Sequence, residues 1–350
     1  MNNHDVLDEA YERLRVTGPE FRGWLSNHGP MAADALLRLG RGDDVHRWVA
    51  GYERRLQPAP EPRWPITETD WRDLLGDPSR LGDWLKFFTL LVHEEPWDQV
   101  LTRWWPRLLP GAVASATHAL IRTGHVVRAL LEQVTTARLD ELGQALGYWA
   151  ARWQPVPGYQ PASGDQPVGP ALDALPQVAM EGDWGMRARL VQLGQVPSWR
   201  TALTSHRPPQ TAADVPTALD ALTDAAVTRY QRWAHGDPVM LVHAATAPRA
   251  ARLILPALPT DLWRPTYDTA WAISAAITVA YRPDRPSPAP AADPDTAEDL
   301  SVEGLADRAA TNRDEHVIKF VEVATESHRR GNPTALAAGT RAAALIVPSW

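Results

Sequence analysis

Lysine, the rarest basic residue of the chain, occurs where it could do chemistry. Among 35 lysines and arginines only Lys86 and Lys319 are lysine, and Lys319 follows His316 by three residues in an apolar segment. Residues at this spacing share one face of a helix. Arginine keeps its proton in a protein, whereas a buried lysine loses it readily. Lys319 could therefore act as a base, or be carboxylated by CO2 and join histidines around a metal ion; alternatively, its stem packs on the core while the ammonium group stays in water.

Four of the eleven histidines lie in apolar or small-residue segments, where an imidazole needs a polar partner. These four are His28, His118, His243 and His316. Five others lie in polar contexts and are expected at the surface: His4, His46, His206, His235 and His328. No HExxH pair or similar short metal motif occurs. A metal site would therefore be assembled from distant segments.

His118 and His125 belong to one predicted helix, with Arg122 between them. Seven residues are nearly two helical turns, so the two imidazoles share a face but are separated by about 10 Å along the axis. A single ion is reached more easily from residues three or four apart. We therefore predict His118 as a ligand, with His125 beside the ligands or facing substrate. Arg122 could hold an anionic or enolate oxygen, or form an ordinary salt bridge.

Composition and missing motifs exclude several classes of protein. The absence of cysteine excludes thiolate catalysis, zinc ribbons and iron–sulfur clusters. A formal charge of −7 argues against sequence-independent binding of nucleic acid. Neither a membrane span nor a signal peptide is apparent, so we expect a cytoplasmic protein that does not bind membranes. Flavin-type GxGxxG, P-loop and GxSxG motifs are absent, while the 16 tryptophans could pack in the core or line a pocket for a flat aromatic substrate.

The elements that must position these residues are helices, because apolar residues recur at helical spacing through most of the chain. The expected helices span 31–39, 81–92, 110–132, 136–153, 215–233, 238–255, 268–281, 302–328 and 333–344. Residues 154–170 and 282–297 each contain five prolines and are expected to be long loops. We predict a mainly α fold in which residues 1–350 form a single large domain.

Four of these segments together resemble the questin oxidase-like family. They are Asn27–Ala32, Leu109–Gly111 with Thr117–His125, Val242–Pro248 and Glu315–Phe320. They follow the same order as in the family and span nearly the whole chain. The resemblance implies a multi-helical oxygenase that cleaves the ring of an anthraquinone-type compound, often within a polyketide pathway. In fungal members a second histidine lies one turn after the first in the central helix, where this chain has Arg122.

The resemblance also implies a ligand set for a non-haem iron ion. His28, His118, His243, His316 and a carboxylated Lys319 fit the four histidines and modified lysine proposed for the family. Nitrogen and oxygen donors of this kind suit Fe(II) or Mn(II) and also tolerate zinc, and a sixth position remains for water, O2 or a substrate oxygen. Asp314, Glu315 or Glu322 could accept hydrogen bonds from the ligands.

Three functions remain open from the sequence. The first is an iron-dependent oxygenase that acts with O2 on a small aromatic molecule. The second is a metal-free, NADPH-dependent monooxygenase of the Baeyer–Villiger type, in which histidines act as acids and bases. The third is a non-catalytic helical protein that binds a small molecule.

Overall fold

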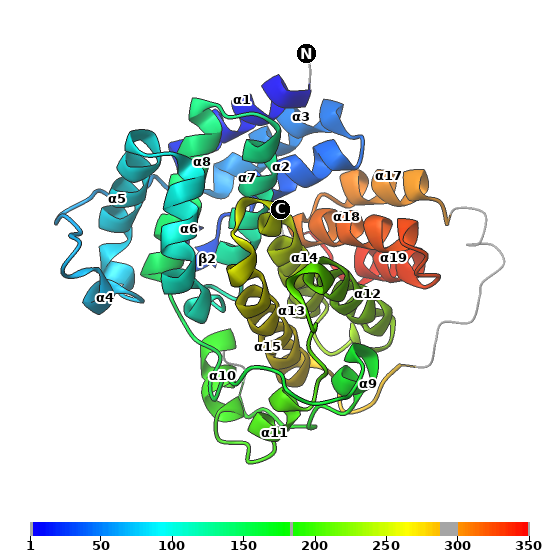
Figure 1. Ribbon diagram of the computed structural model, residues 1–350. Helices are drawn as coiled ribbons and strands as arrows, with labels where there is room; N and C mark the ends of the chain where they lie inside the picture. Colours follow the sequence, from blue (N-terminus) through cyan, green and yellow to red (C-terminus); the bar gives the residue numbers. More distant parts are fainter. Residues whose placement is uncertain (1–2, 183–184, 288–299, 349–350) are drawn as a thin grey trace. The chain divides into compact units, whose positions relative to one another are not determined.

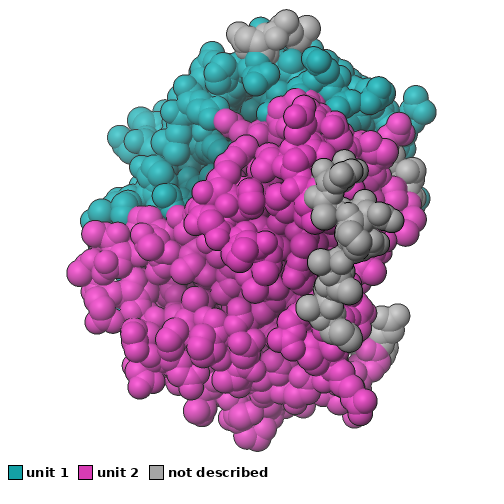
Figure 2. Space-filling view, turned by 90° about the vertical axis from the view of Figure 1, so that its right-hand side faces the viewer, with its two compact units in different colours: residues 1–37, 42–156, 250–266 teal, residues 38–41, 157–249, 267–350 magenta. Residues whose placement is uncertain are grey.

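The structure is a computed structural model that describes residues 3–182, 185–287 and 300–348, and these residues are mainly α-helical, as predicted. It divides into two compact units, coloured teal and magenta in Figure 2. Unit 1 comprises residues 1–37, 42–156 and 250–266, and unit 2 comprises residues 38–41, 157–249 and 267–350. The single-domain organisation expected from the sequence stays a prediction.

Helices and two short strands follow one another along the chain (Figure 1). The first part contains α1 (Asn3–Arg15), β1 (Glu20–Phe21), β2 (Leu25–Ser26), α2 (Gly29–Arg38), α3 (Gly42–Tyr52), α4 (Trp71–Leu74), α5 (Leu81–Glu94), α6 (Trp97–Leu108), α7 (His118–Glu132) and α8 (Thr136–Ala151). The second part contains α9 (Val168–Asp173), α10 (Met186–Leu193), α11 (Trp199–Thr204), α12 (Val215–Trp233), α13 (Pro238–Leu241), α14 (His243–Ile254), α15 (Trp263–Tyr281), α17 (Val302–Asn312), α18 (Glu315–Arg329) and α19 (Ala335–Leu345). The strands pair antiparallel, with Glu20 opposite Ser26.

The helix α8 is central to unit 1, where it packs against α1, α5 and α7. Two glycines let α5 approach closely. A Cβ atom on Gly143 would lie 2.7 Å from Cα of Thr89, and one on Gly147 would lie 2.9 Å from Cα of Leu85. Larger side chains at these positions would push the two helices apart.

The helix α18 has the corresponding place in unit 2, where it packs against α12, α17 and α19 (Figure 1). Arg249 of α14 donates a hydrogen bond to Glu326 of α18 at 2.6 Å. On the other side of α14, the hydroxyl of Ser274 in α15 donates to the carbonyl of Ala244 at 2.7 Å. These contacts fix α14 between α15 and α18.

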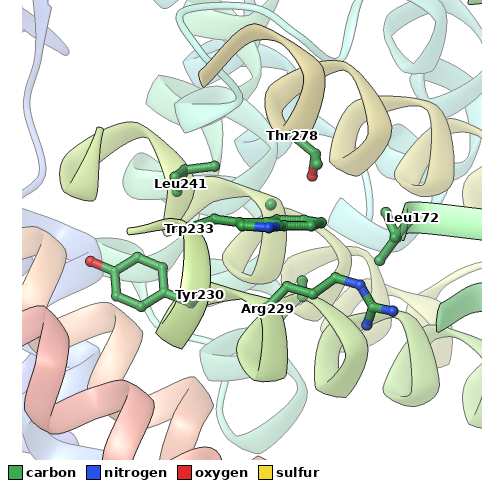
Figure 3. Close-up of a pocket in the computed structure, with 8 residues that line it drawn as sticks. Leu172, Arg229, Tyr230, Trp233, Leu241 and Thr278 are labelled. Atoms are coloured by element: carbon green, nitrogen blue, oxygen red, sulfur yellow. The ribbon is translucent and has the colours of Figure 1, made fainter. Parts of the chain in front are cut away.

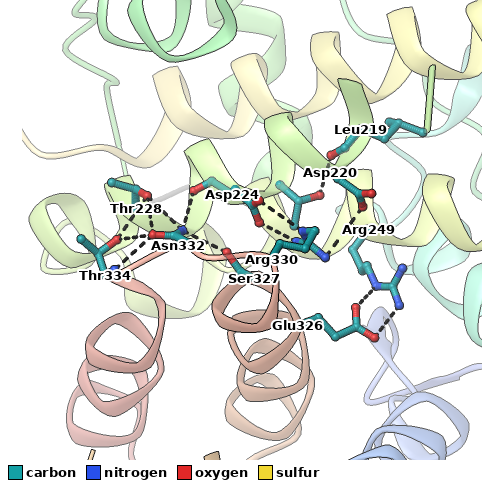
Figure 4. Close-up of polar contacts among 11 residues, drawn as sticks. Leu219, Asp220, Asp224, Thr228, Arg249, Glu326, Ser327, Arg330, Asn332 and Thr334 are labelled. Carbon is teal, nitrogen blue, oxygen red and sulfur yellow. Dashed lines mark hydrogen bonds and ion pairs between the residues drawn. The ribbon is translucent and has the colours of Figure 1, made fainter. Parts of the chain in front are cut away.

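Asn332, in the turn between α18 and α19, joins both helices to α12 (Figure 4). Its amide nitrogen donates to Ser327 at 2.9 Å and to Thr228 at 3.1 Å, and its oxygen accepts from the backbone N–H of Thr334 at 3.1 Å. Because the buried Ser327 and the half-buried Thr228 and Thr334 would lose hydrogen bonds, we expect Asn332→Ala to lower the free energy of unfolding by about 2 kcal/mol. Urea denaturation measures this. The exposed Arg329→Ala serves as control, and equal stability of both variants would contradict the prediction.

Three of the predicted helices are interrupted, and each interruption falls just before a histidine. The segment 110–132 becomes helical only at His118, after Ser115, Ala116 and Thr117 have adopted positive φ angles. The segment 238–255 divides between α13 and α14, so that α14 begins at His243. The segment 302–328 divides at Arg313, which has a φ of 69°, and α18 follows.

The first proline-rich segment is irregular from residue 155 to residue 167, where α9 then begins. Isolated bridges join Gln154, at its start, to Ala112 and Gln166, near its end, to His206. Of the second segment, residues 282–287 are irregular, and residues 288–297 lie outside the described residues. Proline, which cannot donate a backbone hydrogen bond, accounts for the lack of helix in both.

Candidate metal centre

Unit 1 brings His28 and His118 side by side. Their ring centroids lie 4.3 Å apart, and each ring offers a nitrogen within 4.8 Å of the other. Both side chains are buried. Two imidazole nitrogens bound to one ion at about 2.1 Å each would lie about 3–4 Å apart. A small movement of either ring therefore suffices for both to bind one metal ion.

The sequence around His28 explains why the imidazole is fixed at the start of α2. The side-chain oxygen of Asn27 accepts the backbone N–H of Gly29 at 2.9 Å, and the N–H of His28 donates to the hydroxyl of Tyr52 at 2.8 Å. A Cβ atom on Gly29 would lie 2.7 Å from the side chain of Leu14, so any larger residue would force Leu14 of α1 to move. Pro30 follows in the first turn, where its missing N–H costs nothing.

His118 is positioned by a left-handed turn. Ser115, Ala116 and Thr117 have φ angles of 49°, 53° and 72°, and the Nδ1–H group of His118 donates to the carbonyl of Ser115 at 2.5 Å. A neutral imidazole that donates through Nδ1 carries its lone pair on Nε2, and metal-binding histidines are commonly held in this way. Three consecutive non-glycine residues in this conformation are strained, and such strain concentrates at functional sites.

The strain at Ala116 leads to a stability prediction. A left-handed conformation costs a residue with a Cβ atom about 1–2 kcal/mol, and glycine avoids this cost. Part of the resulting gain in stability is lost because glycine has greater conformational freedom in the unfolded chain. We therefore expect Ala116→Gly to raise the free energy of unfolding by about 0.5 kcal/mol. Ala116→Val, whose branched Cβ fits this conformation worst, should lower it instead. Urea denaturation measures the stability of both variants. A less stable Ala116→Gly than Ala116→Val would contradict the left-handed conformation of Ala116.

Arg122 and His125, the two residues predicted to act on substrate, both have buried carboxylate partners in unit 1. Arg122 forms a two-pronged ion pair with Glu141, with distances of 2.5 and 2.6 Å. Its Nη1 atom is buried and has no hydrogen-bond partner among the described residues. His125 donates through Nδ1 to Asp34 at 2.8 Å, and Arg128 also pairs with Asp34.

These contacts orient the side chains of Arg122 and His125, whose roles on substrate stay predictions. The Glu141 carboxylate is fully enclosed, so burial raises its pKa while the guanidinium of Arg122 opposes that rise. His125, held through Nδ1, keeps Nε2 as its proton acceptor. Asp34 was not identified from the sequence; the signal was an acidic residue within the apolar segment 31–39, six residues after His28.

Unit 2 brings His243 and His316 together, with ring centroids 5.6 Å apart. His243 is fully buried, and it is the first residue of α14. Asp314 caps α18: its carboxylate accepts the backbone N–H of His316 at 2.8 Å and the ring Nδ1–H at 3.2 Å. The lone pair of His316 is thereby on Nε2. Asp314, one of the three acidic residues predicted to orient the ligands, thus bonds an imidazole.

Lys319 lies one turn after His316 and is 1% exposed, so the alternative of a stem in the core with its head in water does not describe it. Burial lowers the pKa of the ammonium group to about 8, against the opposing effect of the carboxylates of Glu315 and Asp314. The unprotonated amine is therefore far more abundant near neutral pH than it is for a lysine with the ordinary pKa of 10.5. The other lysine, Lys86, is exposed on α5.

All four candidate histidines lie at helix N-termini. His28 precedes α2, His118 and His243 begin α7 and α14, and His316 is the second residue of α18. The backbone N–H groups and the helix dipole make such ends favourable for negative charge. An anionic oxygen, such as a carboxylated lysine or a phenolate, would be stabilised in these surroundings.

A pocket in unit 2 lies beside the helix that begins at His243 (Figure 3). Its lining includes Trp233, Leu241, Ala244 and Thr278, but only about 10 Å³ is open to a water-sized sphere. That volume holds at most about one water molecule. The pocket is therefore too small for an aromatic substrate.

Many of the tryptophans pack in the cores of the units. Those fully buried are Trp84, Trp104, Trp105, Trp149, Trp199 and Trp271. In unit 1, Trp104 makes edge contacts with Trp71, Trp84 and Phe88. Core packing accounts for these residues without a ligand.

The comparison with known families concerns the part of the chain around His28 and His118. Residues 26–135 match the family model described as Questin oxidase-like. Over this region the chain is similar to the questin oxidase-like family. No curated protein matches the chain. The match confirms the resemblance predicted from the sequence.

The questin oxidase-like region contains His28, His118, Arg122 and His125, whereas His243, His316 and Lys319 lie outside it. Its family implies an oxidoreductase with an oxygenase-type role on natural products.

Within the described part of the chain, no helix combines the length and hydropathy needed to span a membrane.

Proposed function

We propose that this chain is a non-haem iron oxygenase that oxidises or cleaves a ring of an aromatic, polyketide-type compound with O2. In this proposal His28, His118, His243, His316 and Lys319 bind one Fe(II) ion. The observation that carries it is the pairing of imidazoles within each unit, at helix N-termini and with Nδ1 of His118 and of His316 engaged. A donor set of nitrogen and oxygen without sulfur suits Fe(II).

Lys319 joins this donor set after reaction with CO2. Its neutral amine attacks the carbon of CO2, a C–N bond forms, and one N–H proton leaves to solvent, so that a carbamate with two oxygen donors results. The reaction requires the unprotonated amine, and lowering the pKa from 10.5 to about 8 raises the fraction of amine at neutral pH. Arginine, which stays protonated, cannot replace it.

The iron ion, when bound, supplies O2 binding and electron transfer. The remaining tasks fall to the chain. His125, held by Asp34, accepts the proton of a phenolic hydroxyl at Nε2. The Nη1 group of Arg122, buried and still able to donate, stabilises the resulting anionic oxygen. Glu141 keeps that guanidinium in place.

Metal content tests the proposal. Full-length protein produced with iron should contain close to one iron per chain, and His316→Ala and Lys319→Arg should lose most of it, because each removes a donor. Two matched controls use the same residue types: His328→Ala, exposed on the same helix, and Lys86→Arg, exposed on α5, should retain parental iron. Elemental analysis of the purified proteins measures their iron content per chain.

Carboxylation has its own readout, since the chain contains only two lysines. With ¹³C-bicarbonate, the NMR spectrum should contain a lysine carbamate signal that persists in Lys86→Arg and vanishes in Lys319→Arg. Metal-free protein that oxidises substrate at the full rate with NADPH would overturn the iron proposal and favour the Baeyer–Villiger alternative. Parental iron content in both ligand variants would also overturn it.

A further inference from the structure

His206, which was expected at the surface, is instead buried in unit 2, with 2% of its area exposed. It contacts two aromatic residues of α15 that are also buried, Tyr267 and Trp271. The surface expectation failed because the partners of His206 come from residues 40 and 61 positions away. No role in the proposed iron site involves these three side chains.

The hydrogen bonds of His206 fix which ring nitrogen carries the proton. Nδ1 lies 3.1 Å from the backbone carbonyl of Gln166, which can only accept, so Nδ1 is the donor. In the neutral ring Nε2 is then an acceptor, and the phenol of Tyr267 donates to it. The phenol proton of Tyr267 thus points at a basic nitrogen.

Trp271 lies on α15 between this pair and the part of the helix that contacts the backbone beside His243. Its indole ring packs on the ring of His206 with centroids 4.5 Å apart, one helical turn after Tyr267. Ser274, a further turn along α15, donates to the carbonyl of Ala244, the residue after His243. Within unit 2, α15 therefore leads from the backbone beside His243 through Trp271 to the Tyr267–His206 pair.

We propose that Tyr267 is a redox-active tyrosine that receives oxidising equivalents through Trp271. Tyr267 loses one electron to a one-electron oxidant and its phenol proton to Nε2 of His206, so a neutral tyrosyl radical and an imidazolium result. On re-reduction the proton returns. In the cell the iron ion of the proposed function, when bound, would supply the one-electron oxidant together with O2, and to that extent the inference rests on the proposed function. Transfer of the oxidising equivalent to Tyr267 protects the proposed iron ligands when no substrate is oxidised.

Tyr230 provides a matched comparison within unit 2. It is as deeply buried as Tyr267, but its hydroxyl donates to the backbone carbonyl of Pro238 at 2.9 Å. An amide carbonyl is not basic enough to take the phenol proton. Oxidation of Tyr230 would therefore have to produce a buried, charged phenol cation, which is unfavourable.

The experiment supplies its own oxidant and so does not depend on iron. The chain has no cysteine, so Ser163→Cys in the full-length protein gives one attachment point for a ruthenium polypyridyl photosensitiser. Ser163 is exposed, and its backbone pairs with the segment that leads to His206. Flash oxidation of the ruthenium in metal-free protein, in the presence of a cobalt(III) acceptor, should produce a tyrosyl signal by electron paramagnetic resonance.

The signal should disappear in Tyr267→Phe, persist in Tyr230→Phe, and be lost in His206→Gln, whose amide cannot take the proton. Should Tyr267→Phe not fold, a nitroso spin trap followed by peptide mass spectrometry locates the radical in the unsubstituted tyrosine background. Absence of any tyrosyl signal, its survival in Tyr267→Phe, or a trapped radical elsewhere would overturn the inference. Failure of the iron proposal leaves these outcomes unaffected, because no iron is used.

Discussion

Replacing Arg122 with methionine is expected to lower the free energy of unfolding by about 3–5 kcal/mol, the cost of leaving a buried charge without its partner. Arg122 is 1% exposed and Glu141 is 4% exposed. The variant leaves the carboxylate of Glu141 enclosed in unit 1 without the guanidinium that opposes its protonation. Urea denaturation at neutral pH measures the loss.

The double variant Arg122→Met/Glu141→Leu separates the structural role of Arg122 from its proposed role on substrate. Because both charges are removed together, we expect its stability to be close to that of the parent. If Nη1 of Arg122 holds an anionic oxygen, the double variant folds and binds iron but turns over slowly. A loss below about 1 kcal/mol in Arg122→Met, the value of an exposed pair, would contradict the buried pair.

The helices could be predicted from the sequence, but their interruptions could not. The apolar pattern over 215–233 gives the bounds of α12 as they are found. Within 302–328 the pattern continues through Arg313, a residue whose positive φ has no sequence signal of the kind that glycine provides. The same holds for residues 115–117. The interruptions that were missed are those that put His118, His243 and His316 at helix N-termini.

The candidate ligands could be proposed from residue type and context, whereas most of the groups that orient them could not. His118 is held by the carbonyl of Ser115, and every residue has such a carbonyl, so the sequence contains no trace of this contact. Asp314 was found because a carboxylate two residues before a histidine is visible in the sequence. Asp34 and Tyr52 contact His125 and His28 across large sequence distances, which only the fold brings together.

Replacing Lys319 should stabilise the metal-free chain, whereas replacing Arg122 should destabilise it. The pKa of Lys319 is about 8 in the folded chain and 10.5 in the unfolded chain. Between these values the unfolded chain binds more protons, so stability rises with pH. The difference corresponds to a cost of about 3 kcal/mol, which is fully present below pH 8 and vanishes as the pH rises above 10.5.

In metal-free protein and CO2-free buffer, Lys319→Met should therefore be more stable than the parent at pH 7, by up to about 3 kcal/mol, and the gain should shrink toward pH 10. Lys86→Met, at an exposed position, should change stability little at either pH. Urea denaturation across this range measures the effect, and a gain independent of pH would show that the charge is not its cause. The same variant cannot form a carbamate and should lose iron. A residue whose removal stabilises the fold and abolishes metal binding is retained for its chemistry.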